Sequence, residues 1–148
     1  MTQTLQISSG FIESWLKLTR FGNLVIIGFA QYFTAGFLIG KETIYDYKLF
    51  LLSVSTVLIA AAGYIINDYY DVKIDYINKP ERVVIGKNIT RRFAILFHVL
   101  LSVVGISIGF YLSLWLAAIN LLSVFLLWLY SLVRLSPSAS CPRSAWRA

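Results

Sequence analysis

Charged residues and cysteines are scarce in this sequence. Only 14% of the 148 residues are charged, and no Asp or Glu follows Glu81. Cys141 is the single cysteine, which excludes a disulfide within the chain. The net charge is +6, but no long basic run is interleaved with aromatic residues, so we expect no nucleic-acid partner. The excess of Lys and Arg fits membrane loops and a phosphate-binding site instead.

Apolar residues make up most of what remains. Hydrophobic residues account for 58% of the chain, and its mean hydropathy is +0.73. A soluble domain of this length could not bury so much apolar surface, whereas a bilayer accepts it when helices satisfy the backbone hydrogen bonds. The composition therefore predicts an all-α fold, an integral membrane helical bundle.

Uncharged runs predict about four transmembrane helices. About 20 helical residues span the roughly 30 Å of a bilayer core, and the run 93–133 would form about 62 Å of helix, enough for two spans. No apolar run precedes Phe21, which argues against a secretory signal. We expect a turn near Tyr111 and Trp115, aromatics that suit the interface. The predicted spans are about 21–40, 49–66, 93–112 and 114–133.

The basic residues predict the orientation of these spans. Of the 13 Lys and Arg, only Lys41 and Lys48 lie in the loop between the first two spans, and the others lie at the opposite ends of the spans. Cytoplasmic loops of membrane proteins carry the excess of Lys and Arg. We therefore expect a multi-pass protein of the cell (inner) membrane, with both termini and residues 67–92 on the cytoplasmic side.

An acidic motif directly follows the second predicted span. On a helix its three aspartates would fall within about 60° of one another. Carboxylates about 6 Å apart repel, and more strongly at low dielectric, so a cation should lie among them. Mg²⁺ is typically held by one or two carboxylates and the phosphates of a substrate. The motif therefore predicts a Mg²⁺ and diphosphate site, with solvation of a helix end as the alternative. The residues on this face are Asp68, Asp71 and Asp75, with Asn67 and Tyr64.

Basic residues close behind this motif suit the same chemistry. Lys79 and Arg82 flank Pro80, where they could neutralise charge that develops on a leaving diphosphate. Anchoring to anionic lipid is an equal alternative for the others, which are Lys73, Lys87, Arg91 and Arg92.

Local signals mark the ends of helices in this region. The residue before a proline is disfavoured in a helix, so the helix with the aspartates should end near Asn78. Thr90 or Asn88 could cap the next helix. His98 and Asn120 lie within spans, and for both we favour a helix–helix hydrogen bond, or an interfacial position near a helix end, over a functional role.

The motifs resemble those of a known family. Residues 67–75 read NDYYDVKID, and NKPERVVIGKNIT follows from residue 78. This resembles the UbiA superfamily of intramembrane prenyltransferases, whose signature NDxxDxxxD precedes an Asn-Arg/Lys-Pro segment and a glycine. Asn78, Lys79, Pro80 and Gly86 match the second part, and Arg20 with Asn23 matches a weaker pattern before the first span.

The resemblance covers residues 15–132 and implies a mechanism. Mg²⁺ would bridge the catalytic, metal-binding residues Asp68, Asp71 and Asp75 to a prenyl diphosphate, and the allylic cation left by the diphosphate would alkylate a lipid or aromatic acceptor. The motif region is most similar to geranylgeranylglycerol-phosphate geranylgeranyltransferases. The residues expected at the diphosphate are Asn67, Lys79, Arg82, Arg20 and Asn23.

The sequence also departs from the family, which has about nine spans and a second Asp-rich motif. We therefore expect residues 1–133 to be the N-terminal part of a UbiA-type domain. Residues 134–148, rich in Ser and Arg, would be an atypical tail from a broken reading frame or truncated gene model, or a genuine tail too polar for a packed core.

Three functions stay open at this point. The first is a prenyltransferase, in which two copies of the chain could assemble as a homo-oligomer to complete the cavity. The second is a non-catalytic four-helix membrane fragment or partner subunit. The third, a CDP-alcohol phosphotransferase, is disfavoured because its more tightly spaced, glycine-containing Asp signature is absent.

Overall fold

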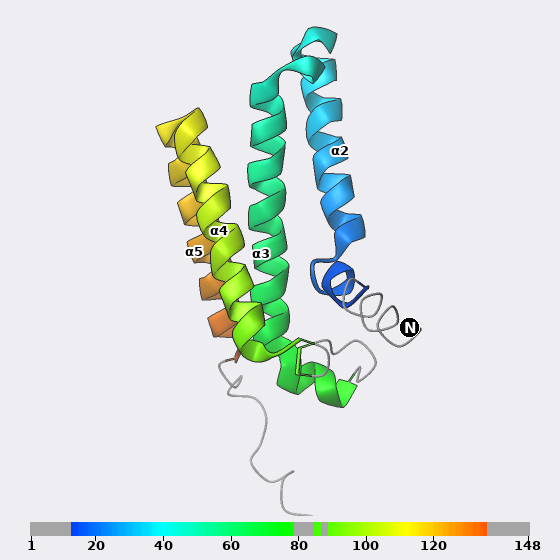
Figure 1. The fold of residues 1–148 in the computed structure, drawn as a ribbon, viewed down its shortest axis with the longest axis vertical. Coiled ribbons are helices and arrows are strands. Elements are labelled where there is room, and N and C mark those ends of the chain that lie inside the picture. The colour runs from blue at the N-terminus through cyan, green and yellow to red at the C-terminus, as the bar shows by residue number, and fades with distance from the viewer. Residues whose placement is uncertain (1–12, 79–84, 87–88, 136–148) are drawn as a thin grey trace, which may run out of the picture.

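The computed structural model describes residues 13–78, 85–86 and 89–135 (Figure 1). The described part is helical, and it has no strand beyond one isolated bridge between Ile85 and Ile89. The all-α prediction is confirmed. The elements from residue 21 onward are helices α2 (Phe21–Leu38), α3 (Tyr47–Asn78), α4 (Arg91–Leu112) and α5 (Leu114–Leu135), with the short 3-10 helix η1 (Lys41–Tyr45).

Among the residues that the structure describes, four helices are long and apolar enough to cross a membrane, as predicted. The chain is thus an integral membrane protein by the length and composition of its helices. The turn between α4 and α5 lies at Ser113, between the two aromatics expected to mark it. α5 continues two residues beyond the predicted limit of its span at residue 133, to Leu135. The qualifying segments are Phe21–Leu38, Tyr47–Val72, Arg91–Leu112 and Leu114–Ser131.

Helix α3 is the centre of the arrangement. It packs against α2, α4 and α5, and α4 also packs against α5. Figure 1 shows α3 between α2 on one side and the α4–α5 pair on the other. Among the elements from Phe21 to Leu135, α2 contacts only α3 and η1. Much of α2 is therefore exposed, including Phe29, Phe33 and Phe37.

Polar groups join the helices in the interior of the bundle. The Ser55 hydroxyl donates to the Gly105 carbonyl at 2.8 Å, and the Asn120 amide donates to the Ser55 oxygen at 2.9 Å. His98 Nδ1 lies 2.9 Å from the carbonyl oxygen of Ala62. Such hydrogen bonds hold helices together where water is absent. The interpretation of His98 and Asn120 as helix–helix contacts is confirmed.

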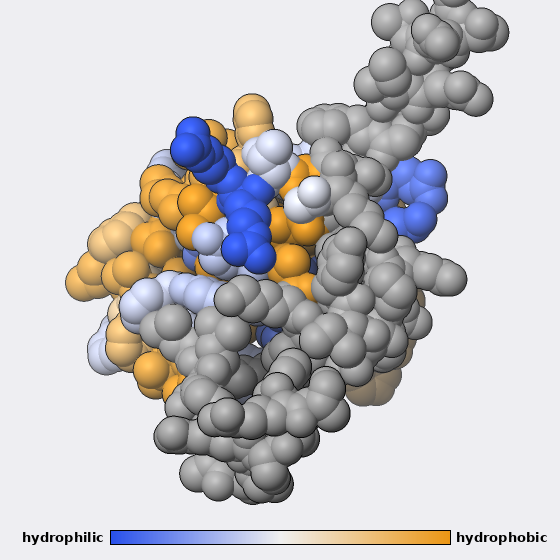
Figure 2. All heavy atoms as spheres, turned by 90° about the horizontal axis from the view of Figure 1, so that it is seen from below, coloured by the Kyte–Doolittle hydropathy of each residue, from blue (hydrophilic) through white to orange (hydrophobic). Residues whose placement is uncertain are grey.

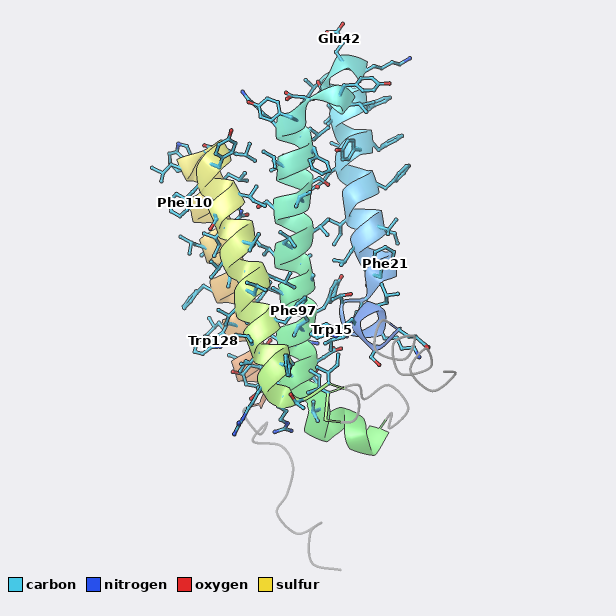
Figure 3. The ribbon with its side chains drawn as sticks, in the orientation of Figure 1. Trp15, Phe21, Glu42, Phe97, Phe110 and Trp128 are labelled. Atoms are coloured by element: carbon cyan, nitrogen blue, oxygen red, sulfur yellow. The ribbon has the colours of Figure 1, made fainter. Side chains whose placement is uncertain are left out.

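A small hydrophobic cluster packs against α3 where the acidic motif begins. Its buried members come from four segments of the chain, and Trp15 packs on Phe97 with ring centroids 4.3 Å apart (Figure 3). The cluster packs Trp15 and Leu18, together with Ile85 and Ile89, against α3 and α4. The buried residues are Leu18, Ile65, Ile85, Ile89 and Ala94.

Two residues shape the chain between α3 and α4. Gly86 has φ of 94°, a conformation that favours glycine, and its N–H donates to the Ile89 carbonyl at 2.7 Å. The Thr90 hydroxyl accepts from the Phe93 N–H at 3.4 Å and caps α4, as expected. The chain therefore enters α4 through a capped first turn.

Candidate functional site

The acidic motif is part of one continuous helix. α3 passes through residue 66 without a break and ends at Asn78, as the following proline predicted. Asn67 Nδ2 donates to Asp71 Oδ2 at 3.3 Å, one helical turn away. Asp71 is only 7% exposed, so the amide contact helps to compensate for the loss of water around this carboxylate.

Arg20 reaches this motif from a distant part of the sequence. Its Nη2 lies 3.1 Å from Asp68 Oδ1, although the two residues are 48 positions apart. The two side chains are 47% and 25% exposed, so the ion pair alone contributes at most about 1 kcal/mol. The structure thus brings together a guanidinium and a carboxylate that sequence analysis assigned to the same site.

Arg20 is held in an unusual backbone conformation. It is the residue before α2 and has φ of 51° and ψ of 53°, in the left-handed region. The segment before it is fixed, because Leu18 is buried and the Thr19 N–H donates to the Trp15 carbonyl at 2.9 Å. The Asn23 N–H then donates to the Arg20 carbonyl at 2.8 Å, which begins α2. This turn precedes α2 at the point where α2 begins to pack against α3.

Tyr64 contacts both predicted residues of this turn. The Arg20 Cζ atom lies 5.2 Å from the centroid of its ring, within the range of a cation–π interaction. Asn23 Nδ2 donates to the Tyr64 hydroxyl in a long hydrogen bond of 3.4 Å. The helical spacing placed Tyr64 on the aspartate face, but its contacts with α2 have no signature in the sequence.

A cavity of about 510 Å³ lies next to these residues. Its walls come from one face of α3 and from α5, and Arg20 lies at one end. Thr56 and Asn67 mark about 16 Å of α3 along it, at 1.5 Å per residue. Sequence analysis missed the lining residues on α5. The lining residues are Arg20, Thr56, Ile59, Ala60, Gly63, Tyr64, Asn67, Leu127, Tyr130 and Ser131.

Gly63 lets α5 approach α3 at this cavity. A Cβ atom there would come within 2.7 Å of Leu127 Cδ1. The arrangement combines an apolar wall with a charged lining residue, Arg20, whose guanidinium also contacts Asp68. It suits a molecule with an apolar tail and an anionic head, because each part would meet its chemical complement.

Other predicted site residues are only partly described or lie outside the description. Asp75 is in α3, but its side chain is not described, and Lys79 and Arg82 lie outside the described residues. Among the described residues, no three His, Cys, Asp or Glu form a group that could hold a metal ion. The convergence of the three aspartates therefore stays a prediction.

Further charged groups surround this end of the bundle. Viewed from below, it presents hydrophilic side chains among apolar ones (Figure 2). The Arg91 Cζ atom lies 6.0 Å from the centroid of the Tyr69 ring. Lys17 Nζ lies 2.7 Å from Glu13 Oε1, and this hydrogen bond and charge lower the pKa of the exposed Glu13 carboxyl.

The fold and the site define a helical membrane protein that has a cavity between its spans and charged residues at one end of them. Residues 29–142 match the model of the UbiA prenyltransferase family, and the chain belongs to this family. The match extends beyond residue 133 into the segment expected to be atypical, and the origin of that segment stays a prediction.

Relatives with similar sequences are archaeal digeranylgeranylglyceryl phosphate synthases. The protein from Saccharolobus solfataricus is 37% identical over 113 residues, which cover 76% of this chain and 39% of the relative. The protein from Sulfolobus acidocaldarius is 36% identical, with 66% of this chain and 36% of the relative covered. That from Methanoregula boonei is 31% identical, with 81% and 42% covered. The chain thus spans about two fifths of the length of these relatives.

A solved structure from work on digeranylgeranylglyceryl phosphate synthase in membranes has the same fold. The TM-score is 0.69 at 24% identity, and the match covers 82% of this chain and 43% of that chain. The prediction of a bundle that forms part of a larger UbiA-type fold agrees with this likeness.

Proposed function

We propose that this chain provides the diphosphate-binding part of a Mg²⁺-dependent prenyltransferase that transfers a prenyl group from a prenyl diphosphate to a lipid acceptor. The observation that carries the proposal is the contact between Arg20 and Asp68 at the end of an apolar cavity. A lipid acceptor is favoured over an aromatic one because the relatives are named as synthases of a glyceryl phosphate lipid.

The donor atoms of this site fit the metal that the family implies. Asp68 and Asp71 offer carboxylate oxygens from adjacent turns of α3, the hard ligands that Mg²⁺ prefers, and Asp75 would be the third. When bound, Mg²⁺ supplies positive charge against the diphosphate. Asn67 orients Asp71 through the hydrogen bond between them. The Asn67 amide would therefore support a metal ligand, Asp71, from behind.

The basic residues would bind the diphosphate and stabilise it as it leaves. In the reaction the allylic C–O bond breaks, its electron pair stays on the diphosphate, and the acceptor forms the new bond and loses a proton. Arg20 lies beside Asp68 and can donate to a phosphate oxygen. Asn23, Lys79 and Arg82 would complete this group of donors.

The cavity would hold the prenyl chain and exclude water from the cation. A volume of about 510 Å³ falls in the usual range for small-molecule sites. Ile59, Ala60 and Leu127 give it apolar walls. Water must be kept out because it would capture the allylic cation before the acceptor does.

We also propose that the site faces the cytoplasm. The basic residues favour an inner-membrane protein with both termini and the acidic motif on that side. A homo-oligomer, in which a second copy of the chain completes the cavity, is part of this proposal. The alternative function is a non-catalytic membrane fragment or partner subunit.

Binding and transfer by the 148-residue chain in lipid nanodiscs test the proposal. Labelled geranylgeranyl diphosphate should bind in the presence of Mg²⁺ and be released by a chelator, and Asp68→Ala or Asp71→Ala should abolish this binding. Transfer would then be measured with glyceryl phosphate lipids and with aromatic acids as acceptors. Binding without transfer would support the partner-subunit alternative. Binding that survives both substitutions would reject the metal assignment.

A further inference from the structure

We propose that Tyr64 is a positioning residue that holds Arg20 between Asp68 and the cavity, so that the guanidinium can pass from the carboxylate to an incoming diphosphate. This inference rests on the proposed function and deepens it. Tyr64 acts through Arg20.

The first support is the set of contacts that Tyr64 makes. The Arg20 Cζ atom lies 5.2 Å from the centroid of its ring, and Asn23 Nδ2 donates to its hydroxyl at 3.4 Å. Tyr64 stands one helical turn before Asp68 on α3, and it also lines the cavity. One side chain thus joins the start of α2 to the acidic motif and to the space that would hold the substrate.

The second support is the backbone of Arg20. Its φ of 51° and ψ of 53° lie in a region that a residue with a Cβ atom rarely adopts. Its ion pair with Asp68 is half exposed, and such a pair shifts an equilibrium by about fivefold at most. Because this ion pair alone is weak, the contact with the Tyr64 ring is a second interaction that keeps the Arg20 side chain in place.

The contact between Tyr64 and Arg20 would matter most while the diphosphate binds. If the Asp68 carboxylate rotates toward a metal and its diphosphate, the ion pair between Arg20 and Asp68 weakens. The Arg20 guanidinium would then need another anionic partner, which the diphosphate supplies. Contact with the ring does not depend on Asp68, so the guanidinium stays at the end of the cavity during the exchange. Without the ring, the side chain would be free to leave for solvent, and the diphosphate would have to order it again at an entropic cost.

Two substitutions separate the ring from the hydroxyl. Tyr64→Leu removes the ring and should raise the dissociation constant of geranylgeranyl diphosphate with Mg²⁺ by about 3- to 30-fold, the range of a cation–π contact. Tyr64→Phe keeps the ring and loses only the Asn23 contact, so the increase should stay below about threefold. Tyr111→Leu is the matched control, because Tyr111 is 74% exposed and lies at the C-terminal end of α4, away from the acidic motif. It should bind like the wild type.

A second measurement needs no ligand. In the wild type, the tyrosine ring should shift the side-chain proton resonances of Arg20 upfield, and Arg20→Lys identifies those resonances by removing them. The upfield shift should vanish in Tyr64→Leu and persist in Tyr64→Phe and Tyr111→Leu. Circular dichroism of each variant checks that the helices are retained.

The outcomes distinguish this proposal from the proposed function. If the wild type binds the diphosphate and Tyr64→Leu binds equally well, Tyr64 has no positioning role while the proposed function stands. If the wild type binds no diphosphate, the proposed function fails, and the resonances of Arg20 still decide whether Tyr64 holds it. An Arg20 without an upfield shift in the wild type would overturn the proposal directly.

Discussion

At the scale of single residues, the site depends on pairs that lie far apart in sequence or one helical turn apart. Arg20 with Asp68 is a pair of the first kind, and Asn67 with Asp71 is one of the second. Sequence analysis identified all four residues from the motifs and their spacing. It could not give the left-handed backbone of Arg20, because that conformation depends on the packing of residues 13–18 against α3 and α4.

Asn67 provides a prediction at this scale. Asn67→Ala removes the donor that orients the Asp71 carboxylate, and loss of such a supporting contact typically weakens metal binding by about 10- to 100-fold. Mg²⁺ titration in the presence of geranylgeranyl diphosphate should show this loss. Tyr111→Leu, a substitution of an exposed residue at the C-terminal end of α4, should leave the Mg²⁺ affinity nearly unchanged. Equal effects of the two substitutions would contradict a specific role of Asn67.

At the scale of elements, simple sequence signals fixed where helices begin and end. Pro80 predicted the end of α3, Thr90 the cap of α4, and the aromatics at 111 and 115 the turn before α5. How the helices pack could not be predicted in the same way. The contact of Gly63 with Leu127, and with it the cavity between α3 and α5, depends on side-chain shapes that have no periodic signature.

Gly105 tests the packing of α3 against α4. A Cβ atom there would lie 2.8 Å from Ile59 Cγ1 and 3.2 Å from the Ser55 carbonyl oxygen, so Gly105→Ala must push the two helices apart. Overpacking of this kind costs about 1–3 kcal/mol. Unfolding in mixed micelles should show the loss of stability. Gly22→Ala is the matched control, since no atom lies within 4 Å of its added Cβ and its stability should hardly fall.

At the scale of the whole molecule, the site lies at one end of the spans and η1 at the other. Figure 3 shows Glu42 far from Trp15 along the long axis. The four candidate spans in the described part of the chain were predictable from hydropathy, because lipid imposes a simple rule on helix length. The metal group was predicted on one helix face, and the convergence of Asp68, Asp71 and Asp75 stays a prediction.

Orientation in the membrane is the prediction at this scale. Cys141 is the only cysteine, so an impermeant maleimide should label it only when the cytoplasmic face is accessible. With Cys141→Ser as background, a cysteine placed at position 42 should be labelled from the opposite face in intact cells. Labelling of both positions from the same side would contradict the orientation.

The left-handed conformation of Arg20 means that stability of the fold and binding of a ligand place different demands on the residue at this position. Arg20→Ala keeps a strain of about 1–2 kcal/mol and loses the contacts with Asp68 and Tyr64, whereas Arg20→Gly loses the contacts and relieves the strain. The glycine variant should therefore unfold at a higher temperature than the alanine variant, and both should bind geranylgeranyl diphosphate poorly. For stability alone, glycine at position 20 would serve about as well as arginine, because the relief of strain offsets the loss of the two contacts. An arginine there is the residue that ligand binding, rather than folding, would retain.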